Sequence, residues 1–473
     1  MGRSSTRLLC SNAAGSDPVD VLATHCRARV GKQVGVWRAS SALSPAIRGH
    51  PSASTPGVRY EGEGGHLKSS NEPTHSSANS GAFWSYGALA AALAGIALVT
   101  YLAVWGRRYG LDLRVYRESA RAWDHGHNPY ALTFTRSQLA FTYPPFALLV
   151  LSSLTWASFA VTQWFLWALS AVAATATVVF ILKDRGYAGG TTLWFGAFAW
   201  ACASMIVLEP ARSGIDYGQI EFILMFLVVA DLLVVPPRYR GVAIGIAAAI
   251  KLTPLVFVLV FLVRRDWRSA VRTALSFMVW TSFTWLQWPK LSRVFWAHDV
   301  VHPARVGTVA SGGNQSWYGI LHRSPFPVTG SLPAWLVLSL ATVLVSTFVA
   351  WRCVNTERQS FAIIAVALAG LLISPISWTH HWIWVLLIPP MLIGPRRHGT
   401  KSAIRTMLWS LVALTVVAPY WWFSGGVASE AVAALVSLWT FALLVVWSTV
   451  EFSQWRRGPL RTMPRIMEQA TAP

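Results

Sequence analysis

Charged residues are scarce in this sequence. Only 12% of its 473 residues are Asp, Glu, Lys or Arg, whereas 54% are hydrophobic and the mean hydropathy is +0.45. A soluble domain of this length would carry about twice that fraction of charged residues. The composition therefore excludes an ordinary soluble enzyme and indicates a protein that lies largely within a membrane.

Cysteine is scarce as well. The four cysteines, Cys10, Cys26, Cys202 and Cys353, show neither a pairing pattern nor the spacing of metal ligands. Cys202 lies in an apolar run, where it is expected to be a small buried hydrophobic residue. No disulfide framework and no metal site are predicted, and no cofactor is expected.

Residues 1–80 lack any sustained apolar pattern and are rich in Ser, Gly, Ala, Pro and Arg. They also lack the apolar core of a secretory signal. This segment is predicted to be a disordered tail. A membrane domain is expected over 81–455, and a short cytoplasmic C-terminal tail over 456–473.

Acidic residues are few: 19 Asp and Glu oppose 39 Lys and Arg, which gives a net charge of +20. In a soluble protein this excess would suggest nucleic-acid binding. Here the basic residues stand in short segments between apolar runs, namely PPRYR (236–240), RRDWR (264–268), PRRH (395–398) and WRR (455–457). Such segments are typical of cytoplasmic loops. Membrane lipids, and no nucleic acid, are therefore the expected partners.

Apolar runs of about the length of a bilayer follow one another from residue 82 onward. The predicted segments are 83–105, 144–157, 160–182, 192–209, 219–235, 241–263, 269–288, 333–351, 360–375, 380–394, 403–423 and 428–450. They amount to eleven or twelve crossings, because 144–157 and 380–394 are short and are candidates for re-entrant segments. The expected fold is an all-α polytopic membrane protein with large outer loops.

The basic segments also orient the predicted helices. With the N-terminal tail inside, the loops 106–143, 289–332 and 374–381 face outward. PPRYR and RRDWR both have the character of cytoplasmic loops, although a single run, 241–263, separates them. Either this run is broken or re-entrant, or the local charge pattern is misleading.

The first outer loop carries an acid close to a membrane segment. It begins with D112-L-R-V-Y116 and continues to F141-T-Y143-P-P. Tyr116 and Tyr143 have a simple explanation as aromatic residues at the membrane interface. Asp112 has no such explanation. It is either half of an ion pair, with Arg114 or Arg108, or a catalytic group.

Lys251 lies in the middle of an apolar run, AAAIKLTP. A lysine at the centre of a membrane helix costs about 2.5–3.5 kcal/mol on insertion scales and is functional by default. The alternative is a side chain that reaches the interface, which would require Pro254 to break the helix.

Further polar residues stand at the predicted outer boundary. Gln219 opens one apolar run, and SPISWTHH (374–381) sets Trp378 beside His380 and His381. Adjacent histidines cannot share one helix face, so a two-His metal site is not expected. One histidine that faces a phosphate or a sugar fits the pattern better.

The outer loop 289–332 contains GGNQSWYGILHR. Asn314 and Gln315 supply amides that suit pairs of sugar hydroxyls, and the neighbouring aromatic rings suit the C–H face of a sugar. An ordered turn with interfacial aromatic residues explains this segment equally well.

Six of these motifs, in this order, resemble glycosyltransferase family 87. They are DLRVYRESARAWDHGHNPY, FTYPPFALL, GQIEFIL, GVAIGIAAAIKLTP, NQSWYGIL and SPISWTHHWIW. The resemblance spans about 105–395. It implies a GT-C-type membrane glycosyltransferase, in a family that includes polyprenol-phosphate-mannose-dependent α-mannosyltransferases of mycobacteria and related actinobacteria.

The resemblance implies roles for individual residues. Asp112, the acid of the DLxVY motif, is the implied catalytic base, and the SW-x-HH motif is intact at Trp378, His380 and His381. The chain departs from the family's GQ-x-N pattern, because Glu221 stands in place of the Asn. A DxD pair for a nucleotide-sugar metal site is missing where it would be expected, which suits a lipid-phosphate donor.

The implied reaction moves mannose from polyprenyl phosphate mannose to a glycolipid or lipoglycan, such as phosphatidylinositol mannoside, lipomannan or lipoarabinomannan, on the outer face of the plasma membrane. Asp112 would take the acceptor's proton in an inverting step. Lys251, His381 and Arg114 are the candidates for binding the leaving phosphate. The candidates for sugar and acceptor binding are Tyr116, Tyr143, Gln219, Asn314, Gln315, Trp378 and His380.

Two other functions stay open at this point. An arabinofuranosyltransferase with a polyprenyl phosphate arabinose donor would share the fold. A transporter or flippase of lipid-linked sugars would also be polytopic, but transporters commonly contain paired repeats, and we find no internal repeat. A member of the family that has lost catalysis is disfavoured, because Asp112 is retained.

Overall fold

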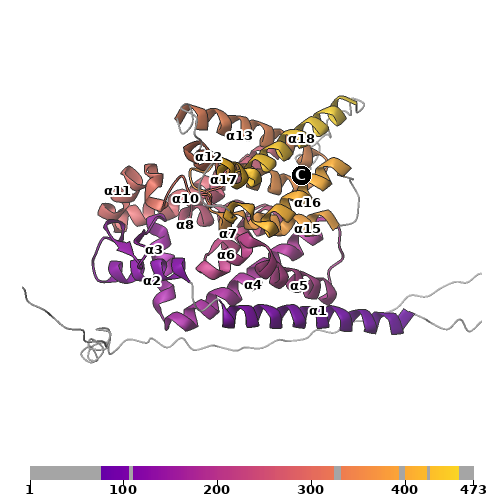
Figure 1. The fold of residues 1–473 in the computed structure, drawn as a ribbon, viewed down its shortest axis with the longest axis horizontal. Coiled ribbons are helices and arrows are strands. Elements are labelled where there is room, and N and C mark those ends of the chain that lie inside the picture. Colours follow the sequence, from indigo (N-terminus) through magenta and orange to yellow (C-terminus); the bar gives the residue numbers. More distant parts are fainter. Residues whose placement is uncertain (1–75, 106–109, 324–331, 394–399, 423–426, 458–473) are drawn as a thin grey trace, which may run out of the picture. The chain divides into compact units, whose positions relative to one another are not determined.

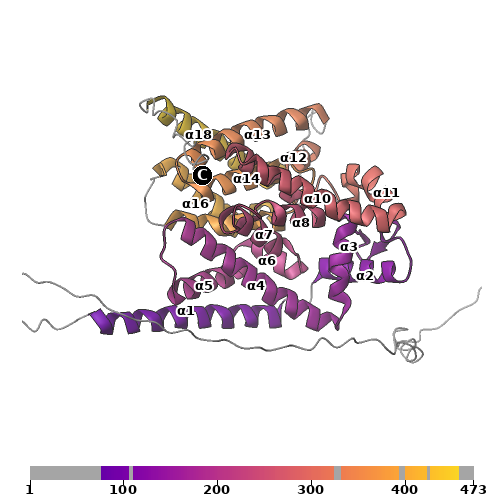
Figure 2. The same cartoon turned by 180° about the vertical axis from the view of Figure 1, so that it is seen from behind.

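The computed structural model describes residues 76–105, 110–323, 332–393, 400–422 and 427–457, and the structural statements below refer to these ranges. They are almost entirely helical (Figures 1 and 2). Most of the predicted tail, 1–75, and the C-terminal residues 458–473 lie outside the described residues, as does Arg108. The first helix begins at Ser76, within the segment predicted to be a tail.

The elements up to residue 263 begin with a long helix, which is followed by further helices and two short strands. They are α1 (Ser76–Val104), α2 (Leu111–Asp124), η2 (Pro129–Ala131), β1 (Thr133–Phe134), β2 (Leu139–Ala140), α3 (Pro145–Ser152), η3 (Ser153–Thr155), α4 (Phe159–Asp184), α5 (Thr191–Val207), α6 (Glu209–Tyr217), α7 (Glu221–Leu233), α8 (Val242–Ile250), η4 (Thr253–Phe257) and α9 (Val258–Val263). The two short strands pair antiparallel, with Thr133 opposite Ala140.

The remaining elements are again helical. They are α10 (Trp267–Gln287), α11 (Pro289–Ala297), η5 (Asp299–Val301), η6 (Pro303–Val306), α12 (Trp317–Arg323), α13 (Leu332–Asn355), α14 (Gln359–Ile373), η7 (Thr379–Leu387), α15 (Ile388–Ile393), α16 (Ser402–Val417), η8 (Pro419–Trp421), α17 (Val427–Ala433) and α18 (Leu435–Arg457).

Five described helices are long and apolar enough to cross a membrane. They are Tyr86–Val104, Phe159–Asp184, Leu332–Asn355, Ser402–Trp421 and Leu435–Arg456. Helices α5 and α6 together pass the same test but are bent by 84°. Four shorter apolar helices accompany them, at Pro145–Thr155, Thr253–Val263, Gln359–Ile373 and Thr379–Ile393. The predicted all-α polytopic fold is confirmed. Several of the eleven or twelve predicted runs are bent or short in the described part of the chain.

The bend between α5 and α6 directs the next loop toward α2. Pro210 lies in the first turn of α6, and α6 ends at Gly218, whose φ of +73° is left-handed. A Cβ atom at Gly218 would also lie 2.8 Å from the Cβ of Leu113 in α2. Glycine is therefore needed both for the backbone angle and for the close approach of α2. Gln219 follows immediately, at the contact between the two helices.

The run 241–263 is broken at Lys251. Helix α8 ends at Ile250, Lys251 is extended (φ −147°, ψ 128°), and a 3₁₀ turn with Pro254 leads into α9. Pro254 lacks the N–H that would donate to the carbonyl oxygen of Ile250 and continue α8. Of the two explanations for the basic segments, the structure therefore supports the broken element.

The broken element returns the chain to the end from which it started. The side chain of Arg272, in α10, donates to the carbonyl oxygens of Pro237 (2.8 Å) and Arg240 (3.3 Å). Arg264, at the end of α9, donates to the carbonyl oxygen of Leu232 at 3.0 Å. PPRYR and RRDWR thus lie at the same end of the helices, and Lys251 stands at the apex of the segment between them.

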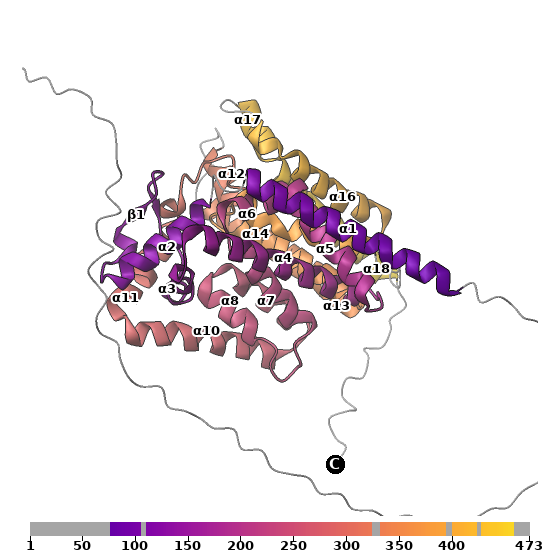
Figure 3. The ribbon, with the colours of Figure 1, turned by 90° about the horizontal axis from the view of Figure 1, so that it is seen from below.

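The helices pack around a continuous apolar core that includes most of α14 and η7. Helix α1 packs along α5 on one side, and α13 packs against α18 on the opposite side (Figures 1 and 2). Helix α8 packs against both α7 and α10, which Figure 3 shows from below. A second apolar cluster joins α2, α3, α8 and α11. The loop after α6, the break at Lys251 and the start of η7 meet between these two clusters.

Candidate active site

Asp112 lies in the first turn of α2. The helix begins after Gly110, whose φ of +62° is left-handed and whose N–H donates to the carbonyl oxygen of Asp216 at 2.7 Å. A Cβ atom at Gly110 would lie 2.8 Å from the Phe159 ring, so this turn also depends on glycine. The N-terminus of a helix favours a carboxylate. The partly buried Asp112 side chain faces the loop after α6 rather than forming the predicted ion pair with Arg114.

Gln219 connects Asp112 to three other side chains. Its Nε2 donates to Asp112 Oδ2 at 2.5 Å and lies 3.2 Å from Nε2 of His380. Its Oε1 accepts hydrogen bonds from the hydroxyls of Tyr116 (2.8 Å) and Tyr143 (3.2 Å). The two tyrosine hydroxyls are themselves 2.9 Å apart. The predicted residues of four separate motifs therefore form one hydrogen-bonded network.

Lys251 joins this network from the apex of the broken element. Its ammonium lies 2.5 Å from Oε1 of Glu221, 3.3 Å from Nε2 of His381 and 3.4 Å from the hydroxyl of Tyr143. The side chains of Lys251 and Glu221 are only 12% and 8% exposed. An uncompensated charge would be costly at this burial, so each group depends on the other.

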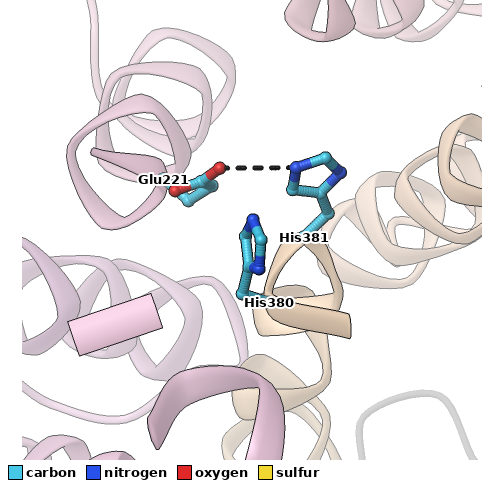
Figure 4. A group of neighbouring side chains, drawn as sticks. All are labelled: Glu221, His380 and His381. Carbon is cyan, nitrogen blue, oxygen red and sulfur yellow. Dashed lines mark ion pairs between the residues drawn. The ribbon is translucent and has the colours of Figure 1, made fainter. Parts of the chain in front are cut away.

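Glu221, His380 and His381 lie close together, as Figure 4 shows, and their ligand atoms are all within 4.8 Å of one another. That spacing is compatible with a divalent metal ion. However, the ammonium of Lys251 already contacts both Glu221 and His381. A metal ion would have to share these ligand atoms with the positive charge of Lys251. We therefore interpret the cluster as the surroundings of Lys251.

The surroundings of Asp112 change its acidity. Burial raises the pKa of the Asp112 carboxyl to about 7, and the negative charge of Glu221 adds to the rise. The hydrogen bond from Gln219 and the positive charge of Lys251 act in the opposite direction. A carboxylate with a pKa near neutral can accept a proton much more readily than an ordinary aspartate, as general-base catalysis requires.

Comparison with known proteins identifies the family. The model of glycosyltransferase family 87 matches residues 141–375. Two polyprenol-phosphate-mannose-dependent alpha-(1-2)-phosphatidylinositol mannoside mannosyltransferases are similar over most of their length. The protein of Mycolicibacterium smegmatis is 30% identical, covering 77% of this chain and 90% of the relative. That of Mycobacterium tuberculosis is 32% identical, covering 67% and 78%. The chain belongs to glycosyltransferase family 87.

A third relative in this family, a polyprenol-phosphate-mannose-dependent alpha-(1-2)-phosphatidylinositol pentamannoside mannosyltransferase of Mycobacterium tuberculosis, is 33% identical, covering 69% of this chain and 75% of the relative. No solved structure matches the chain. As a member of family 87 the protein is a membrane glycosyltransferase, which confirms the predicted enzyme class. The matched residues 141–375 include Gln219, Glu221 and Lys251, whereas Asp112 precedes them and His380 follows them.

Asn314 and Gln315 of this family 87 chain lie in a different, fully buried place. The amide nitrogen of Asn314 donates to the carbonyl oxygens of Val309 (3.0 Å) and Pro375 (3.3 Å). The amide nitrogen of Gln315 donates to the carbonyl oxygens of Gly312 and Ala433, each at 2.7 Å. These bonds tie the loop 289–332 to neighbouring segments. Sugar binding by these amides stays a prediction, and the ordered turn is the arrangement observed.

Two other predicted residues lie at the edge of the site. The guanidinium of Arg114 is 4.2 Å from the centre of the Phe159 ring, and Arg114 is exposed. Asp112 and Arg114 are two residues apart on a helix and therefore face different directions. Trp378 is half-buried, and its backbone forms an isolated antiparallel bridge with Asn314.

Sequence analysis missed Glu209, which holds the SW-x-HH segment in place. Its Oε1 accepts hydrogen bonds from Ser213 (2.6 Å), Thr379 (2.9 Å) and Trp421 (3.1 Å), and its Oε2 accepts one from Tyr420. Glu209 is 2% exposed. An acid at the end of an apolar run was the available signal. Its partners could not be read because two of them follow more than 200 residues later.

Proposed function

We propose that this family 87 enzyme transfers mannose from polyprenyl phosphate mannose to a phosphatidylinositol mannoside or a related lipoglycan on the outer membrane face, with inversion at the anomeric carbon and Asp112 as the base. The observation that carries this proposal is the Asp112 carboxyl, whose pKa is raised to about 7 and which accepts a hydrogen bond from Gln219. The names of the relatives support the donor and the acceptor.

The reaction uses the two ends of the network differently. The acceptor oxygen attacks the anomeric carbon and gives its proton to Asp112. The bond from that carbon to the phosphate oxygen breaks, and its electron pair leaves with the phosphate. Attack on the face opposite the phosphate converts a β-linked mannosyl phosphate into an α-mannoside, with the stereochemical logic of inverting glycosidases.

The leaving phosphate gains negative charge as the bond breaks, and fixed positive or hydrogen-bonding groups stabilise it. Lys251 and His381 are the groups that we assign to this task, because the ammonium lies 3.3 Å from Nε2 of His381 and is connected to Asp112 through Tyr143 and Gln219. We assign acceptor and sugar contacts to Tyr116, Tyr143, Gln219 and His380, which lie between the base and the cation.

The charge distribution supports an outward-facing site. Helix α4 has 26 residues and is about 39 Å long. Its Phe159 end lies beneath Arg114, near the site. At its other end the Asp184 carboxylate accepts a hydrogen bond from the N–H of Ser360 at 3.0 Å, beside Arg264, whose Nε donates to Gln359 at 3.0 Å. The basic segments PPRYR and RRDWR thus lie at the end of α4 away from Asp112, and the positive-inside rule favours the cytoplasm for that end.

The proposal is tested with the full-length protein in lipid nanodiscs. We expect radiolabelled mannose to pass from polyprenyl phosphate mannose to phosphatidylinositol mannoside, and linkage analysis to give an α-mannoside. Polyprenyl phosphate arabinose and a nucleoside diphosphate mannose are tested as alternative donors. The Asp112→Asn variant is the inactive control. Transfer from the arabinose donor alone, or a β-linked product, would overturn the proposal.

A further inference from the structure

Glu221 occupies the point at which the groups assigned to the donor phosphate converge. One of its oxygens, Oε1, is 2.5 Å from the Lys251 ammonium and 3.7 Å from Nε2 of His381. A carboxylate oxygen and a phosphate oxygen use the same hydrogen-bond donors. Lys251 therefore already holds an anion that belongs to the protein.

The second oxygen of Glu221 is placed differently. Within the described part of the chain, Oε2 is buried and has no hydrogen-bond partner, and the same is true of the Ser377 hydroxyl. Both residues line one small cavity, of about 50 Å³, together with Lys251 and His381. A cavity of this size holds a water molecule or a displaced carboxylate. A buried atom without a partner on each of two residues that line the same cavity indicates room for a second position of the Glu221 side chain.

We infer that Glu221 is a built-in competitor of the donor phosphate. When the site is empty, its carboxylate neutralises Lys251. When the donor binds, the phosphate takes that place, and the carboxylate turns into the cavity, where the Ser377 hydroxyl can donate to it. This inference rests on the proposed function for the identity of the anion, a lipid-linked phosphate.

The same competition acts more strongly on the product. The donor is a phosphodiester with one negative charge, and transfer of the sugar leaves a lipid phosphate monoester. A phosphate monoester has a second pKa of about 6 and so carries close to two negative charges at neutral pH. A carboxylate beside Lys251 repels this product more than it repels the donor. Glu221 therefore limits donor affinity and favours release of the spent carrier.

The test compares Glu221→Gln with the unchanged protein in nanodiscs. We expect the KM for polyprenyl phosphate mannose to fall about tenfold, since removal of a neighbouring like charge is worth at least one tenfold step in binding. The Kd for polyprenyl monophosphate, measured without acceptor, should fall by at least as much. An unchanged or higher Kd would overturn the inference, because a purely structural partner of Lys251 would weaken anion binding when removed.

A matched control removes another buried acid from the same helix. Asp231, in α7, accepts hydrogen bonds from the N–H groups of Gly241 (2.7 Å) and Ile244 (2.8 Å) and is fully buried. Asp231→Asn should lower the thermal midpoint and leave the Kd for polyprenyl monophosphate unchanged. If this variant tightened binding as much as Glu221→Gln does, the effect would not belong to the site, and the inference would fail.

Ser377→Ala tests the second position of the carboxylate and does not require Glu221→Gln to fold. We expect it to raise the KM for the donor about threefold, because the displaced Glu221 loses its only new hydrogen bond. In a Glu221→Gln background the effect should disappear. An unchanged KM in the single variant contradicts the inference. Failure of the unchanged protein to transfer mannose would overturn the proposed function alone, because the monophosphate Kd does not depend on transfer.

Discussion

Two polar clusters lie inside this apolar protein, and they differ in the partners of their side chains. Around Asn314 the amides bond mainly to backbone carbonyl oxygens, such as those of Val309 and Pro375. Around Gln219 the side chains bond to other side chains, including the ionisable groups of Asp112 and His380. Side chains that bond to the backbone fix loops, whereas linked ionisable side chains can move protons. The second arrangement is the one suited to chemistry.

Among the variants considered, Asp112→Asn is expected to have the largest effect on activity. The amide has the shape of the acid but cannot accept a proton, so kcat should fall about 10³-fold. Since the fold raises the pKa of Asp112 above its unfolded value, the ionised group destabilises the fold as the pH rises from about 4 to 7. The variant should therefore be at least as heat-stable at pH 8. Mannosyl transfer within tenfold of normal would remove Asp112 from the mechanism.

Asn314→Ala should show the opposite pattern. It removes two hydrogen bonds to carbonyl oxygens and leaves the buried N–H of Ser377 without its acceptor, so the free energy of unfolding should fall by about 3 kcal/mol. Turnover per folded molecule should stay within about threefold of normal. Asn355→Ala is the control, because this exposed side chain makes one hydrogen bond, to the carbonyl oxygen of Trp351. A stable Asn314 variant with a much higher acceptor KM would instead support sugar binding by this amide.

The pH dependence of transfer sharpens the comparison further. A base must be deprotonated, so kcat/KM should fall about tenfold per pH unit below pH 7. The charged and polar groups that face Asp112 are Glu221, Lys251, Tyr116, Tyr143 and Gln219. Because Glu221 raises the pKa of Asp112, Glu221→Gln should move the fall in kcat/KM to lower pH. If kcat/KM falls at the same pH in both proteins, Asp112 is not the group whose protonation causes the fall.

Arg114→Ala should have the smallest effect. Its guanidinium stacks on Phe159 rather than joining Lys251 and His381, so the KM for the donor should change less than threefold. Loss of the stacking contact should lower the thermal midpoint slightly. An increase in donor KM of tenfold or more would place Arg114 with the phosphate-binding groups.

The sequence was informative where one residue was anomalous in its surroundings. Asp112 beside a membrane segment and Lys251 within an apolar run both join the side-chain network around Gln219. Pro254 gave the signal for the break that brings Lys251 there. The contact of Glu221 with Lys251 was not predicted, since it spans 30 residues and depends on how α7 meets the broken element. The order of the motifs predicted the family. It did not distinguish residues that bond to the backbone of neighbouring segments, such as Asn314, from residues of the Gln219 network.

Helix boundaries were harder to predict than the fold class. The predicted run 192–209 matches α5 (Thr191–Val207), but the 84° turn that follows at Leu208, and the helix α6 beyond it, were not predicted. Helix α6 contains Glu209, Arg212 and Asp216 and is much less apolar than α5, so a search for apolar runs does not detect it. The turn is stabilised by Glu209 and its distant partners, which no local pattern reveals.

The orientation of the Gln219 amide has a consequence for His380. An ionised carboxylate only accepts hydrogen bonds, so the NH₂ group of Gln219 must face Asp112 and the oxygen must face the two tyrosines. The same NH₂ group lies against Nε2 of His380. That nitrogen must therefore be the bare one, and His380 carries its proton on Nδ1. A single amide thus fixes the tautomer of an imidazole 161 residues further along the chain.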